Sequence, residues 1–161
     1  MAESARAVLT TPQFEHETVT EVLLWRLLND DRPVAYHAEA PQGGFRPVPA
    51  SEARRETLAL AAALPGLGLQ RGDRVAILAA TRHEWVRCDM ANLLCGLVTV
   101  GIYPTCTVEQ VGYILEHSQA RVLIVQDAAA LSRVADAVRG SAVEAVYSMD
   151  AGPAVDVGVP V

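Results

Sequence analysis

Apolar and polar residues alternate in blocks along the second half of the chain, and the blocks predict strands and helices in regular succession. Four short apolar runs lack polar alternation, which is typical of strands covered on both faces: residues 74–78, 97–102, 121–125 and 143–149. Three segments with helical spacing lie between them, at residues 82–96, 107–117 and 128–139. This succession predicts an α/β fold, a partial doubly wound parallel sheet with helices on both faces.

The first half of the chain has a less regular pattern. A short apolar helix is expected over residues 20–28, begun by Thr18 or Thr20, and a second helix over residues 51–64, capped by Ser51. Between them, residues 34–36 and 45–48 are expected to pair across a turn at residues 41–44. We therefore expect an N-terminal arm at residues 1–19, one α/β subdomain at residues 20–150, and an irregular tail or truncation edge at residues 151–161.

Two helices of the regular part begin with the spacing of a capping box. Thr81 stands three residues before Glu84, and Thr107 three residues before Gln110. The helix over residues 82–96 is apolar nearly all round, which predicts burial on two sides. Such burial requires more protein than a sheet of four strands supplies.

Composition excludes several kinds of chemistry. The 161 residues carry a formal net charge of −6, which argues against binding of nucleic acid through phosphate contacts. All 13 basic residues are Arg, so the chain has no lysine for a Schiff base or for a phosphate-binding GK[ST] loop. The three cysteines and four histidines show neither disulfide nor metal-ligand spacing, so we expect no metal site. With no signal peptide and no apolar run of spanning length, the expected location is the cytoplasm.

Residues 71–127 resemble the N-terminal part of the AMP-forming acyl-CoA synthetases, within the adenylate-forming superfamily. The resemblance rests on five pieces of sequence: Gly72–Leu78, Thr81–Trp85, Ile102–Thr105, Thr107–Leu115 and Val122–Asp127. The IYPT and EQVGYIL pieces are most similar to the long-chain fatty acid–CoA ligases. Two positions depart from the family pattern, since Thr81 replaces the usual Asn and His83 the usual Pro.

The resemblance implies a function for an intact enzyme of this family. Such enzymes convert fatty acid, ATP and CoA to acyl-CoA, AMP and pyrophosphate, with Mg²⁺ as a cofactor. The family's phosphate loop and its late catalytic Lys are absent here, so we expect no catalytic residue in this chain, no tight binding of ATP, Mg²⁺ or CoA, and no activity of the chain alone. The alternatives are a standalone acyl/CoA-binding or regulatory module, or a non-functional remnant.

Loops after parallel strands are the expected place for ligands. Two such loops qualify here, residues 79–83 and 103–106. By resemblance, Tyr103, Pro104 and Thr105 lie near the passage for acyl chain and pantetheine, and Arg133 reaches a CoA phosphate. The alternative is that Tyr103 and Pro104 only turn the chain, that Thr105 or Thr107 caps a helix, and that Arg133 is solvated.

The expected partners follow from the same resemblance. Fatty acid and CoA are partners if a missing portion completes the site, and contact with a membrane arises only through the substrate. The apolar helix and the open edge of the last strand predict self-association of the isolated chain.

Overall fold

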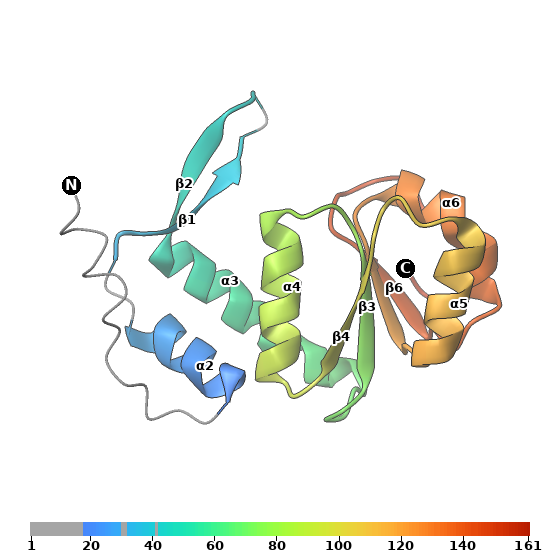
Figure 1. The fold of residues 1–161 in the computed structure, drawn as a ribbon, viewed down its shortest axis with the longest axis horizontal. Helices are drawn as coiled ribbons and strands as arrows, with labels where there is room; N and C mark the ends of the chain where they lie inside the picture. The colour runs from blue at the N-terminus through green and yellow to red at the C-terminus, as the bar shows by residue number, and fades with distance from the viewer. Residues whose placement is uncertain (1–17, 30–31, 41) are drawn as a thin grey trace.

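The computed structural model describes residues 18–29, 32–40 and 42–161, and Figure 1 shows their arrangement. Most of the N-terminal arm predicted at residues 1–19 therefore lies outside the described residues, as does Pro41 of the predicted turn.

A four-stranded parallel sheet forms the centre of the molecule. Its strands are β3 (Arg74–Leu78), β4 (Val98–Ile102), β5 (Val122–Val125) and β6 (Ala145–Ser148), in the spatial order β4-β3-β5-β6. The chain adds β4 on one side of β3 and then β5 and β6 on the other, which makes the sheet doubly wound. The predicted fold class is thereby confirmed, with strand ends shifted by up to two residues.

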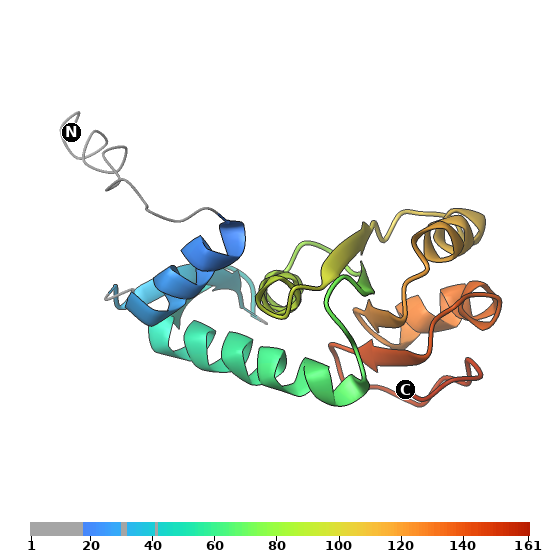
Figure 2. The ribbon, with the colours of Figure 1, turned by 90° about the horizontal axis from the view of Figure 1, so that it is seen from below.

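Helices cover both faces of the sheet, as Figures 1 and 2 show. Helix α4 (His83–Leu94) packs on the face formed by Val75, Ile77 and Ile124. Helices α5 (Val108–Ser118) and α6 (Ala128–Arg139) pack on the other face. Successive residues of a strand point to opposite faces, so a run without polar residues supplies apolar side chains to both cores.

A second group of elements lies against the outer side of α4. It comprises helix α2 (Val19–Asn29), helix α3 (Ala50–Ala63), the 3₁₀ turn η1 (Leu64–Leu67), and an antiparallel hairpin of β1 (Val34–Glu39) and β2 (Phe45–Pro49). Both α2 and α3 contact α4, and the Thr20 hydroxyl donates to the Leu93 carbonyl at 3.2 Å. Protein beyond the four-stranded sheet does cover α4, and the chain's own helices α2 and α3 supply it.

The helix starts differ from those predicted at two places. Helix α3 begins at Ala50, so Ser51 lies inside its first turn and makes no cap. Helix α4 begins at His83 with Arg82 as its N-cap, so Thr81 makes no cap, and the Glu84 carboxylate binds the Arg82 guanidinium. The capping box of Thr107 and Gln110 is confirmed.

The last residues of the chain form neither helix nor strand but contact the sheet. Val157 is buried in the same core as α5 and α6, and the Val146 amide donates to the Pro160 carbonyl at 2.9 Å. Part of the outer edge of β6 is therefore covered by the C-terminal segment.

Candidate functional site

The chain leaves neighbouring strands β3 and β5 toward opposite faces of the sheet. The loop after β3 leads to α4 on one face, and the loop after β5 leads to α6 on the other. In open α/β sheets, ligands bind outside the carboxyl ends of the strands at such a point. Gln126 bridges the two loops, since its side-chain oxygen accepts from the Ala80 amide at 3.1 Å and its backbone amide donates to Leu78 at 3.0 Å.

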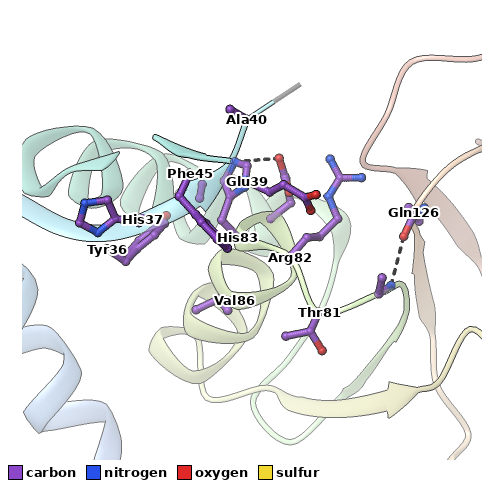
Figure 3. A pocket seen from close by; sticks show the side chains of 13 residues that line it. Tyr36, His37, Glu39, Ala40, Phe45, Thr81, Arg82, His83, Val86 and Gln126 are labelled. Atoms are coloured by element: carbon purple, nitrogen blue, oxygen red, sulfur yellow. Dashed lines mark hydrogen bonds and ion pairs between the residues drawn. The ribbon is translucent and has the colours of Figure 1, made fainter. Parts of the chain in front are cut away.

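A cavity of about 810 Å³ lies between this edge of the sheet and the β1–β2 hairpin, and Figure 3 shows its lining. The hairpin, the loop after β3 and the first turns of α4 supply most of the walls, and Gln126 completes them. Its polar side chains are Tyr36, His37, Glu39, Thr81, Arg82, His83, Glu84 and Gln126. Loop 79–83 was expected at a ligand site, and the structure places most of it in this wall.

Arg82 joins the cavity to the loop after β6. Its Nη1 and Nη2 donate to Asp150 at 2.7 and 3.0 Å, and its Nε donates to Glu84 at 2.5 Å. These bonds, first to Asp150 and then to Glu84, raise the pKa of Arg82 above its ordinary value. Glu84 also pairs with His83 at 2.8 Å. Arg82 thus links two loops at the sheet edge by ion pairs, and we call this link the Arg82 tie. Its positive charge is already neutralised by Asp150 and Glu84.

The Tyr36 hydroxyl is the unusual group of the cavity. Its oxygen is buried and makes no hydrogen bond to the residues that the structure describes. Burial raises the pKa of Tyr36, so the hydroxyl stays protonated at neutral pH and is available as a donor.

Tyr103, Pro104 and Thr105 lie on the loop after β4 and do not line the cavity. Tyr103 is 77% exposed. The structure does bring Arg133 to this loop, because its guanidinium donates to the carbonyls of Pro104 at 2.9 Å and Cys106 at 2.8 Å. Arg133 therefore ties α6 to the loop, and its proposed contact with CoA stays a prediction.

Sequence reasoning missed the hairpin residues, Gln126 and Asp150. Of these residues, only Gln126 could have been proposed from the sequence, because it directly follows a predicted apolar strand. No group of three or more His, Cys, Asp or Glu side chains within residues 18–29, 32–40 and 42–161 is placed to hold a metal ion. The part of the chain that the structure describes holds no helix long and apolar enough to cross a membrane.

Comparison with known proteins then decides the family. A profile described as AMP-binding enzyme matches residues 32–158, which include the sheet and the cavity. The chain belongs to the AMP-binding enzyme family. The resemblance drawn from the sequence pieces is thereby confirmed.

The relatives of this chain include a fatty acid–CoA ligase and a shorter uncharacterized protein. The long-chain-fatty-acid–CoA ligase FadD15 of Mycobacterium bovis is 37% identical over 122 residues, which cover 76% of this chain and 20% of that protein. The chain thus spans about a fifth of the length of this relative. An uncharacterized protein of Mycobacterium tuberculosis is 31% identical over 96 residues, 58% of this chain and 52% of its own length.

Solved structures of the AMP-binding family share the fold. A fatty acyl CoA synthetase of Mycobacterium tuberculosis matches with a TM-score of 0.68 and 25% identity, over 80% of this chain and 26% of that one. The adenylation domain of a carboxylate reductase from Mycobacterium chelonae matches with a TM-score of 0.70 and 25% identity, over 94% of this chain and 25% of that one.

Proposed function

We propose that this chain is the N-terminal part of an AMP-forming fatty acid–CoA ligase, which is inactive until a second portion completes its site. The observation that carries the proposal is the 37% identity to FadD15 over 76% of this chain but only 20% of that protein. The intact enzyme would join a fatty acid to CoA with ATP and Mg²⁺. Cytoplasmic location stays a prediction of the sequence.

In the first step of this reaction the fatty acid carboxylate attacks the α-phosphorus of ATP, and pyrophosphate leaves. The residues of this chain do not fit a site for that step. Transfer at a phosphate of ATP depends on cationic groups and a metal ion that neutralise the developing charge. The chain has no lysine, and the cavity's one arginine, Arg82, is bound to Asp150 and Glu84. We therefore expect ATP and Mg²⁺ to be held by residues outside this chain.

Pyrophosphate release tests the proposal. The purified chain, incubated with ATP, Mg²⁺ and palmitate, should give no release above a blank without protein. The same chain, co-expressed with the part of FadD15 outside the aligned segment, should give release that depends on palmitate. Turnover by the chain alone would overturn the claim of inactivity, and equal activity of the FadD15 portion by itself would overturn the role as a ligase part.

Tyr103, Pro104 and Thr105 are proposed to line the passage for the acyl chain and pantetheine. In the reconstituted pair, Tyr103→Ala should weaken the CoA-dependent step more than release of pyrophosphate. Tyr113→Ala is a matched control, because Tyr113 is also an exposed tyrosine and lies on α5, outside the loop. If Tyr103→Ala and Tyr113→Ala weaken the CoA-dependent step equally, the loop is only a structural turn and does not line the passage.

A second candidate function is a standalone acyl- or CoA-binding module. The short relative from Mycobacterium tuberculosis favours it, since the shared segment makes up 52% of that protein. Titration of the isolated chain with palmitoyl-CoA, followed by calorimetry, tests this candidate. Saturable binding by the chain alone supports the module, whereas its absence together with activity of the reconstituted pair supports the ligase part.

A further inference from the structure

One face of the sheet is covered less completely than the other. On the α5–α6 face the core is continuous from β4 to β6 and includes Val146. Tyr147 follows Val146 in β6 and so points to the opposite face, where it is 41% exposed. Parallel sheets are ordinarily covered by helices on both faces, but no helix among residues 18–29, 32–40 and 42–161 covers this face of β6 at Tyr147.

An apolar groove of about 440 Å³ marks this place, and we call it the α3–β6 groove. Its walls are the C-terminal half of α3 with η1, one side of α4, and the adjoining face of β5 and β6. Figure 2 shows the end of α3 next to β6 along the lower side of the molecule. The residues used below are Leu60, Ala63, Leu67, Cys88, Ile124 and Tyr147.

The charges of the groove are gathered at one end. Arg87 pairs there with Glu56 and, at 3.7 Å, with Glu84, and Glu84 also binds Arg82 at 2.5 Å, so the charges at this end are paired with one another. The remaining wall is apolar apart from Ser148. An apolar groove whose charges are already paired suits the apolar stripe of an amphipathic helix.

We propose that the α3–β6 groove is the docking surface for an amphipathic helix of the polypeptide that completes the ligase. The proposal rests on the proposed function, because the occupant is sought in the four-fifths of FadD15 that this chain does not match. The M. tuberculosis acyl-CoA synthetase likewise holds this fold in a chain of which only 26% is matched. In such longer chains, protein is available to cover an apolar face that here is open.

Co-purification tests the docking. The tagged 161-residue chain is co-expressed with the part of M. bovis FadD15 outside its aligned segment, and the partner retained on the tag is quantified. Ala63→Arg places a charge in the groove, while Ala62→Arg is the matched control, since Ala62 is exposed on the same helix but does not line the groove. We expect Ala63→Arg to lower retention at least about tenfold and Ala62→Arg to leave it unchanged.

Folding of the variants is followed by circular dichroism and thermal unfolding of the isolated chain. Both Ala63 and Ala62 are exposed in the isolated chain. The melting temperatures of both variants should therefore lie within about 2 °C of that of the parent. A second pair, Tyr147→Asp in the groove and Tyr113→Asp on α5, should repeat the contrast. Hydrogen exchange of residues 145–149 should slow in the complex.

The outcomes separate the docking from the proposed function. Retention sensitive to Ala63→Arg but without ligase activity supports the docking and counts against the function. Activity and retention that both survive Ala63→Arg overturn the docking alone. The docking is also overturned if the parent chain retains no partner, if ultracentrifugation shows a homodimer that Ala63→Arg dissociates, or if the groove instead takes up palmitate.

Discussion

Replacing Arg82 by Gln removes the charged tie between the first turn of α4 and the loop after β6. Three hydrogen bonds are lost, two to Asp150 and one to Glu84. The Arg82 side chain is 29% exposed, Glu84 19% and Asp150 45%. The bond to Glu84 is therefore the better shielded of the two contacts.

The loss of unfolding free energy in Arg82→Gln can be worked out from these exposed fractions. A hydrogen bond to a charged group contributes about 1.5–3 kcal/mol when buried, whereas an exposed ion pair contributes about 0–1 kcal/mol. Glu84 keeps His83 as a second partner, which lowers the cost of losing Arg82. We expect Arg82→Gln to lower the free energy of unfolding by about 2 kcal/mol, and the melting temperature by about 4–8 °C for a chain of this length.

Urea unfolding followed by circular dichroism measures the effect. The control is Arg55→Gln, because Arg55 is 70% exposed and its ion pair with Glu56 is 3.7 Å long, and its change should stay within about 0.5 kcal/mol. Asp150→Asn should cost less than Arg82→Gln, and the double variant should show coupling between the two residues.

The pH dependence gives a further check. The pKa of Arg82 is raised in the folded protein, so its contribution is complete at neutral pH and is lost only as the pH rises toward the folded value. The difference between parent and Arg82→Gln should therefore stay constant from about pH 6 to about pH 9. A loss below about 0.5 kcal/mol, or one equal to that of Arg55→Gln, would refute the role of Arg82 as a tie.

Two further predictions concern single groups. Asp127→Ala removes the N-cap of α6, whose carboxylate accepts from the Ala130 amide at 2.7 Å, and should cost about 1 kcal/mol in urea unfolding. Because that bond lowers the pKa of Asp127, the difference from the parent should be full above about pH 4 and should decrease as the pH falls below it; a difference that does not change with pH contradicts the stabilisation of the ionised cap. Burial raises the pKa of Cys88 to about 11, so its alkylation by iodoacetamide at pH 8, measured by peptide mass spectrometry, should be roughly a hundredfold slower than in urea. Equal rates in the folded and unfolded chain would show that Cys88 is accessible.

Local patterns in the sequence were enough for most of the sheet and its helices. Strand β3 matches residues 74–78 as predicted, and α6 matches residues 128–139. A run without polar residues is diagnostic because both faces of a parallel strand are buried. The capping box at Thr107 was also readable, since all of its atoms come from four consecutive residues.

The second capping box shows where local reasoning fails. Thr81 and Glu84 have the required spacing, yet Glu84 binds Arg82 and His83, and Arg82 also reaches Asp150, 68 residues away. Arg82 lies within the window of four residues, but Asp150, which also binds Arg82, does not. The candidate site was missed in part for the same reason, because its hairpin residues meet the loop after β3 only in three dimensions.

Local sequence patterns and composition were sufficient to predict the succession of strands and helices, the absence of lysine chemistry and, through five short pieces, the family. Those properties depend on neighbouring residues or on composition. The three-dimensional packing was needed to show that α2 and α3 cover α4, that Arg133 binds the loop of Tyr103, and that a groove lies beside β6. Each of these depends on contacts between residues distant in the chain, and such contacts are set by how whole elements pack.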